Sequence, residues 1–216
     1  MALFNDRQYI VQRHDSEGDY QIKTKSNDVI CYVKKNSNAA EILDITRIFP
    51  NIPKSQNVSL YKKLFSFYDD SPIEGLIFNL SFLAKDNQTH YQIRKYIGDE
   101  DIVLDVINKD RVIGSIVMKT HLGHIYRKDF CWIYDASHKQ IAETKSHYIF
   151  TVKFTHEIMD VNGKKIGEIK PKWFTFPLKY TVNIYDTAID PVFFIVLAIV
   201  FLELDIKRYL LGDVST

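Results

Sequence analysis

The stretch PVFFIVLAIVFLEL (Pro191–Leu204) carries an uninterrupted apolar run from Val192 to Leu202. As a helix it would rise by about 1.5 Å per residue, roughly 21 Å in all, whereas the hydrocarbon core of a bilayer is about 30 Å thick. It is too short to span comfortably, and a helix without a polar face has to be enclosed by protein. The β-branched residues leave a buried strand as the alternative. The length and the Asp190-Pro191 start, with proline at the first helical position, favour a helix.

Three segments ahead of this helix share one pattern. Each has an alternating apolar strand, a turn rich in Asn, Asp, Ser or Gly, and a second strand that opens with Ile and a small residue. The segments are Ile102–Lys119, Asp129–Lys145 and Thr155–Lys172, and their small residues are Gly114, Ala142 and Gly167. We therefore predict repeated hairpins in which Gly114 and Gly167 take equivalent places.

Turn chemistry supports the hairpins. Asn162-Gly163 predicts a two-residue turn with a positive φ at Gly163, and Asn108–Asp110 and Asp135–Ser137 are good turn formers. Tyr20–Lys34 has the same shape around Ser26–Asp28, and Tyr180–Tyr185 starts a further unit that leads into the helix.

These features predict a mainly β fold of the α+β class, a closed antiparallel β-barrel of repeated hairpins around a central hydrophobic C-terminal helix. We expect one domain over residues 1–216, because no Gly-, Ser- or Pro-rich linker divides the chain. The segment at about 38–88 fits the repeat poorly. We expect it to be a helical or irregular elaboration of the same domain, with a short helix at Ala39–Phe49.

The composition limits the classes of function. Hydrophobic residues make up 46% and aromatic residues 13% of the 216, which is enough for a substantial core. The formal net charge of +1 gives no global attraction to nucleic acid, and no nucleic-acid partner is expected. Two cysteines, Cys31 and Cys131, suit a reducing compartment. Met1–Ile10 lacks the apolar core of a signal peptide, so a cytoplasmic location is expected.

The hairpins around Ser26–Asp28, Asn108–Gly114, Asp135–Ala142 and Asn162–Gly167 are followed by KPKWFTFPLKYTVNIYDTAID (Lys170–Asp190) and the apolar helix. This order resembles the tubby C-terminal-like superfamily, which includes tubby proteins, phospholipid scramblases and LURP-one-related proteins. Lys172-Trp173, with Lys170, is similar to the segment before the final strand in scramblase and LURP-one members. The resemblance covers roughly Leu3–Lys34 and Tyr91–Leu204.

The resemblance implies a twelve-stranded closed barrel around a central helix. Scramblases carry an acidic, calcium-associated segment before the helix, but between Tyr180 and Pro191 this chain has only Asp186 and Asp190. Tubby proteins bind phosphoinositide headgroups through basic residues, and that motif does not transfer to particular positions here.

Other motifs do not specify a reaction. His121 and His124 could share a face of a helical turn, but a third metal ligand is not identifiable, and a loop between hairpins is the alternative. Gly98–Asp101 lacks the alternating oxygen ligands of a calcium loop. Cys131 lies in an apolar strand and is expected to be buried. We therefore predict no catalytic residue, no metal site and no cofactor.

Basic residues concentrate late in the chain, where residues 139–180 hold eight lysines and four acids. Trp173, Phe174 and Phe176 lie among them, a combination that suits a membrane interface. The alternative is that the aromatics face the core and the lysines solubilise the wall. The predicted lipid- or anion-binding residues are Lys164, Lys165, Lys170 and Lys172. By strand alternation Lys170 and Lys172 share the outer face, Trp173 points inward, and Lys164 and Lys165 project outward from the turn.

The leading interpretation is a non-enzymatic binding module that docks on an anionic phospholipid surface or on a partner protein. It would be cytoplasmic and peripheral to a membrane where it docks on lipid, without a transmembrane span. One alternative is a scramblase-like protein that handles phospholipid, which requires a lipid-sized cavity or an inserting helix. Another is an enzyme with a site in the middle third, near Tyr61–Asp70 or His90.

Overall fold

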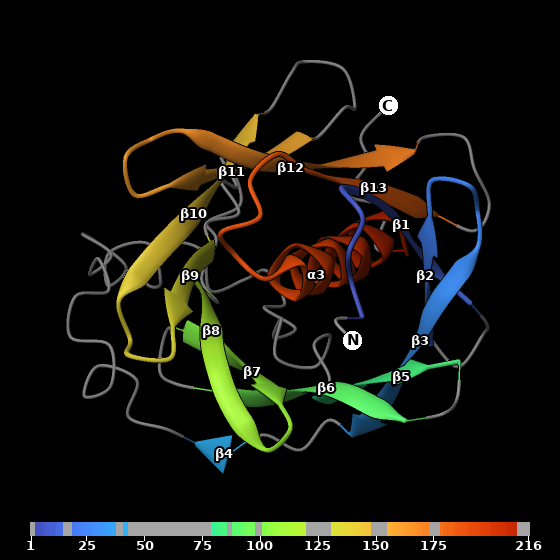
Figure 1. Cartoon of the computed structure of the whole chain (residues 1–216), viewed down its shortest axis with the longest axis horizontal. Coiled ribbons are helices and arrows are strands. Elements are labelled where there is room, and N and C mark those ends of the chain that lie inside the picture. The colour runs from blue at the N-terminus through green and yellow to red at the C-terminus, as the bar shows by residue number, and fades with distance from the viewer. Residues whose placement is uncertain are drawn as a thin grey trace.

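The computed structural model describes residues 3–14, 19–37, 41–42, 79–85, 88–97, 101–119, 131–147, 155–172 and 178–210. Its strands form a closed ring around a helix that lies at the centre (Figure 1). The elements are β1 (Gln8–Arg13), β2 (Tyr20–Thr24), β3 (Val29–Ser37), β4 (Glu41–Ile42), β5 (Asn79–Ala84), β6 (Thr89–Ile97), β7 (Asp101–Asn108), β8 (Arg111–Lys119), β9 (Cys131–Asp135), β10 (Gln140–His147), β11 (Thr155–Asp160), β12 (Lys165–Lys172), β13 (Lys179–Ile184) and α3 (Pro191–Leu210).

All the strands except β4 build an antiparallel barrel in which each strand pairs with its neighbours along the chain. The ring closes where β1 pairs with β13, with Gln8 opposite Asn183. β4 lies outside this ring and pairs in parallel with the end of β6, with Glu41 opposite Tyr96. The closed antiparallel barrel with a C-terminal helix is therefore confirmed.

The helix α3 is enclosed by the barrel. Ile195, Leu197, Ile199 and Phe201 are each 2% exposed or less, as the absence of a polar face predicted. Asp190 caps the helix, because its Oδ1 accepts the Val192 N–H at 3.0 Å and Pro191 follows as the first helical residue. α3 ends at Leu210 instead of the expected Leu204; Lys207 and Arg208, which follow the apolar run, are good helix formers.

Each of the strands β8, β10 and β12 has a β-bulge at the same place, and these bulges explain the repeated Ile followed by a small residue. The register shifts leave Ile113, Ile141 and Ile166 as the extra residues, so that Gly114, Ala142 and Gly167 each follow a bulge. The predicted equivalence of Gly114 and Gly167 is confirmed. Both lie against the start of α3, where a Cβ would come within 2.8 Å of Phe193 Cζ at Gly114 and 2.5 Å of Phe194 Cε1 at Gly167.

The turn between β11 and β12 is longer than predicted. Gly163 has the expected positive φ, +78°. The Gly163 N–H donates to the Asp160 carbonyl at 3.0 Å, and the Asp160 N–H donates to the Lys164 carbonyl at 2.9 Å. These bonds enclose three loop residues, with Gly163 in the left-handed conformation that such a loop needs. The predicted two-residue turn at this position is therefore wrong, because the bulge at Ile166 changes the register.

The same three-residue loop recurs around Asn27 and His138, which also have positive φ. A two-residue turn with two positive φ angles occurs instead at Lys109–Asp110, where Asn108 pairs directly with Arg111. In an up-and-down barrel these hairpin turns gather at one end. We call it the turn end; the start of α3 lies there too, since Phe194 meets Gly167 close to the β11–β12 turn.

The expected elaboration at about 38–88 contains two strands. β5 is part of the barrel wall, and Glu41–Ile42, within the expected helix at Ala39–Phe49, is β4. Residues 43–78 lie outside the described part. Near β4 the wall is apolar on its outer face as well, because Val103, Val117 and Trp132 point away from α3 and are still buried.

Candidate functional site

The four predicted lysines lie on β12 and on the turn before it. Along β12 the side chains alternate, so Gly167 and Ile169 face α3 while Lys170 and Lys172 are exposed on the outer wall. Pro171 is half-buried between them. The shared outer face of Lys170 and Lys172 agrees with the prediction. Trp173 lies outside the described residues, so its predicted inward direction stays a prediction.

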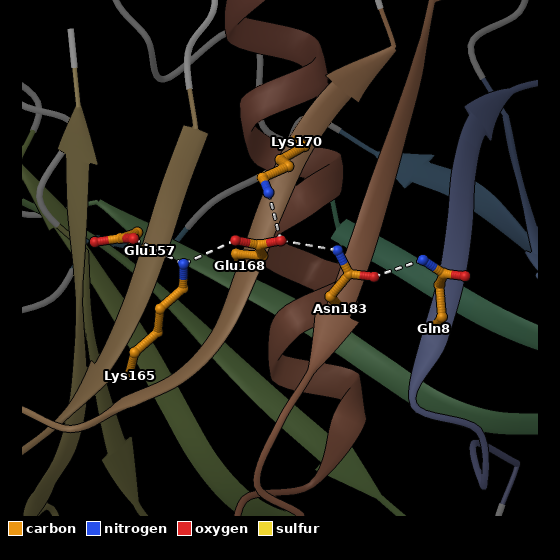
Figure 2. Close-up of polar contacts among 6 residues, drawn as sticks. All are labelled: Gln8, Glu157, Lys165, Glu168, Lys170 and Asn183. Carbon is orange, nitrogen blue, oxygen red and sulfur yellow. Dashed lines mark hydrogen bonds and ion pairs between the residues drawn. The ribbon is translucent and has the colours of Figure 1, made fainter.

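At the turn end, Lys164 and Lys165 are held in ion pairs. Lys164 Nζ lies 2.9 Å from Asp186 Oδ2. Lys165 Nζ lies 2.7 Å from Glu157 Oε1 and 2.8 Å from Glu168 Oε2 (Figure 2). The two carboxylates raise the pKa of Lys165 above its usual value. Lys164 projects outward, as predicted, and its side chain is 66% exposed, but acids from three other positions in the sequence meet the two lysines in the fold.

Glu168 is the centre of this polar cluster. Its carboxylate is buried on the outer wall and contacts Lys165, Lys170 at 2.6 Å and the Asn183 side-chain amide at 3.0 Å. Asn183 in turn accepts a hydrogen bond from Gln8 at 2.6 Å, so the chain of contacts runs from β11 to β1 (Figure 2). Burial alone would raise the pKa of Glu168, but hydrogen bonds led by Lys165 and Lys170 hold it at about 2.

The other end of β12 has a different charge pattern. Lys172 pairs directly with Lys179 of β13, so two ammonium groups leave the same face at neighbouring positions. Lys170 lies on the same face, one pleat closer to Glu168. We call Lys170, Lys172 and Lys179 the basic end. Like charges placed directly opposite each other on two strands are destabilising, and an anion bound between them would relieve that repulsion.

A row of polar side chains continues from the basic end onto β1 and β2. Gln12 pairs with Lys179 across the strands and donates a hydrogen bond to Gln21 Oε1 at 3.2 Å. The Gln21 amide lies 2.7 Å from His14 Nδ1, and the His14 ring contacts Tyr32, with 5.6 Å between the ring centres. The outer wall beside Lys179 is thus lined with hydrogen-bonding groups.

Sequence reasoning missed Lys179 as a site residue. Lys179 is separated from Lys172 by the six residues 173–178, and neither periodicity nor composition states which residues face each other across two strands. The signal that could have found it is the register, which requires the position of the bulge at Ile166.

The remaining candidates are placed as follows. His121, His124, Tyr61–Asp70 and Gly98–Glu100 lie outside the described residues. Cys131 is buried, as expected, and burial also raises the pKa of the Cys31 thiol to about 12. His90 lies on β6 beside a register shift. Within the described ranges, His, Cys, Asp and Glu do not gather in any group of three or more that could hold a metal ion.

Comparisons with known proteins give no relative. No family model, curated protein or solved structure matches this chain. In the part of the chain that the structure describes, no helix is both long and apolar enough to cross a membrane.

Proposed function

We propose that this chain is a non-enzymatic binding domain that docks on an anionic phospholipid surface through the basic end, Lys170, Lys172 and Lys179. The observation that carries the proposal is the direct pairing of Lys172 with Lys179 on the outer wall. Docking would be peripheral, on the cytoplasmic face, where anionic lipids give the membrane surface its negative potential.

The distribution of acidic residues supports docking through the basic end of β12 and not through the turn end. Lys164 and Lys165 meet Asp186, Glu157 and Glu168, so the charge at the turn end is largely cancelled. Glu168 also contacts Lys170, but two lysines share that single buried carboxylate. Lys172 and Lys179 lie further along β12 and β13, opposite each other on the same outer face.

The position of α3 supports docking over lipid transport. A scramblase-like role would require a helix that inserts into the membrane or a lipid-sized cavity. The apolar residues of α3 instead pack inside the barrel, where Val192–Leu202 are all buried. A barrel around a buried helix is also the architecture implied by the resemblance to the tubby C-terminal-like superfamily, and we include membership of that superfamily in the proposal.

The expected attachment is weak and electrostatic. Each lysine near an anionic surface contributes about 1 kcal/mol, and Lys170 is already paired with Glu168, so the basic end gives about 2 kcal/mol, roughly thirtyfold in partitioning. Screening should remove most of it when the ionic strength is raised. The experiment is co-sedimentation with vesicles that contain phosphatidylserine or a phosphoinositide, and with phosphatidylcholine vesicles, at low and high salt.

Two charge-reversal variants make the test specific. Lys172→Glu/Lys179→Glu changes the basic end, whereas Lys25→Glu/Lys139→Glu makes the same change of net charge at exposed positions of the turn end. We expect the first variant to lose binding to anionic vesicles and the second to keep it. Equal retention of both variants, or no binding by the wild type, would contradict the proposal and leave a protein as the better partner.

A further inference from the structure

The segment before β1 closes the turn end of the barrel. Phe4 is 4% exposed and belongs to the buried core, although it precedes the first strand. The segment is fastened to the wall by the Ile184 N–H, which donates to the Arg7 carbonyl at 2.8 Å. In Figure 1 this segment runs beside α3 on its way to β1. The Phe4 side chain thus enters the barrel interior from a segment that is not part of any strand.

Three aromatic rings surround Phe4. Tyr9 of β1 and Phe82 of β5 lie at 5.6 and 6.2 Å, both nearly perpendicular to it. Tyr91 of β6 stacks on it, at 5.8 Å with an interplanar angle of 17°. Phe82 and Tyr91 are direct partners on the paired strands β5 and β6, and Tyr9 comes from β1, so rings from two parts of the wall form a box of which Phe4 is the present occupant.

The box has a polar, acidic side. The Tyr91 hydroxyl donates to Asp190 Oδ2 at 3.2 Å, and Asp190 also caps α3. The Tyr9 hydroxyl is fully buried and lies beside the backbone of Asp6, yet it makes no hydrogen bond of ordinary geometry within the described residues. A buried hydroxyl of this kind is costly, and a ligand that meets it would recover part of that cost.

The electrostatic potential in the box is negative. Burial, together with the carboxylates of Asp6 and Asp190, raises the pKa of Tyr9 to about 12. The positive end of the α3 dipole opposes this with about half an elementary charge, which is less than the full charge of the Asp190 carboxylate. A cation is therefore favoured here over an anion.

We propose that Phe4 is an internal plug in a binding site for a methylated ammonium group, formed by Tyr9, Phe82, Tyr91 and the Asp190 carboxylate. Aromatic rings attract such cations through their negative faces, and the attraction grows when the site is dry. The ligand displaces Phe4, and the segment ahead of β1 moves with it. The site lies at the turn end and is independent of the basic end and of the proposed membrane docking.

The test uses choline and the neutral alcohol in which a carbon atom replaces the choline nitrogen, titrated into the full chain and followed by NMR. Phe4→Ala empties the box. In this variant we expect choline to bind at least about tenfold more tightly than the alcohol, and more tightly than in the wild type. Phe4→Leu empties the box in part and gives the same comparison if Phe4→Ala does not fold.

The matched control is Asp190→Asn in the Phe4→Ala background, because asparagine keeps an oxygen that can cap α3 but has no charge. We expect it to lower the affinity for choline about fivefold or more and to leave that for the alcohol unchanged. Equal affinities for choline and the alcohol in Phe4→Ala would overturn the proposal, because the box would then be only an apolar cavity. Absence of binding by both compounds to both Phe4 variants would also overturn it and make Phe4 an ordinary core residue.

Discussion

The Tyr20 hydroxyl of β2 donates a hydrogen bond to Glu203 Oε1 of α3, and this bond joins the wall of the barrel to the enclosed helix at the end opposite the turns. Lys35 of β3 meets the same carboxylate oxygen at 3.2 Å and lies over the Tyr20 ring. Burial and the nearby Glu203 carboxylate raise the pKa of Tyr20 well above its usual value, so it remains a donor at physiological pH.

Tyr20→Phe should destabilise the protein by about 1.5 to 3 kcal/mol, the usual loss for a hydrogen bond to a charged group. Lys35 would still pair with Glu203, so unfolding should stay cooperative. Urea unfolding, monitored by circular dichroism, gives the free energy of unfolding. The control is Tyr32→Phe, which removes a hydroxyl from a tyrosine that is 36% exposed on the outer wall. If the free energy of unfolding falls by similar amounts in both variants, the hydrogen bond from Tyr20 to Glu203 does not stabilise the protein beyond the effect of removing any tyrosine hydroxyl.

Ile199→Asp should prevent folding. Ile199 is 2% exposed at the centre of α3, and an unpaired carboxylate buried there costs several kcal/mol out of a total stability of about 5 to 15 kcal/mol. The readouts are soluble expression and a thermal melt. Val161→Asp makes the same chemical change in a turn, at a residue that is 59% exposed, and should be nearly neutral. A soluble Ile199→Asp protein with a cooperative melt would contradict the enclosed-helix arrangement.

Gly167→Ala should cost more than Gly163→Ala. At Gly167 the new methyl group would lie 2.5 Å from Phe194 Cε1 and 2.9 Å from the Asn183 carbonyl oxygen. We expect the free energy of unfolding to fall by about 3 kcal/mol, the upper end of the usual range for overpacking. At Gly163 the space is open, and only the positive φ opposes alanine, by about 1 to 2 kcal/mol.

Phe194→Leu, added to Gly167→Ala, separates the two contacts. The shorter side chain should relieve the clash with the ring but not the one with the Asn183 carbonyl, so the double variant should be more stable than the two single losses predict. Additive losses would mean that Phe194 does not restrict position 167.

Much of the fold could be predicted from the sequence, because its determinants are local. The apolar run Val192–Leu202 has no face to offer water, and the Ile and small-residue repeat marks the bulges that face α3. The loop at Asn162-Gly163 was predicted one residue too short, since the bulge at Ile166 is a property of two paired strands. The outer apolar face of β7 to β9 was also missed, because residues such as Val103 and Trp132 are buried on the side that alternation assigns to solvent.

The lysine cluster was harder to predict, because its energetics depend on distant partners. Lys164 meets Asp186, 22 residues away in the sequence, and that contact exists only because the Asp186 segment passes beside the β11–β12 turn. The composition shows these lysines only as an excess of positive charge, whereas the fold pairs Lys164, Lys165 and Lys170 with acids and places Lys172 opposite Lys179.

Glu168 should make the protein sensitive to acid. Its pKa is about 2 in the folded state against 4.5 when unperturbed, so the unfolded state binds the proton more readily. The stabilisation is therefore fully present above about pH 4.5 and is lost as the pH falls toward 2. We expect the free energy of unfolding to fall by about 1 to 3 kcal/mol over that range, measured by urea unfolding at pH 5 and pH 3.

Two variants test whether Glu168 is the cause. Glu168→Gln should be less stable than the wild type at pH 5, but its free energy of unfolding should fall less between the two pH values. Glu143→Gln removes a half-buried carboxylate from β10 and should keep the wild-type slope. If Glu168→Gln and the wild type lose the same free energy between pH 5 and pH 3, the contacts with Lys165 and Lys170 do not control the proton on Glu168.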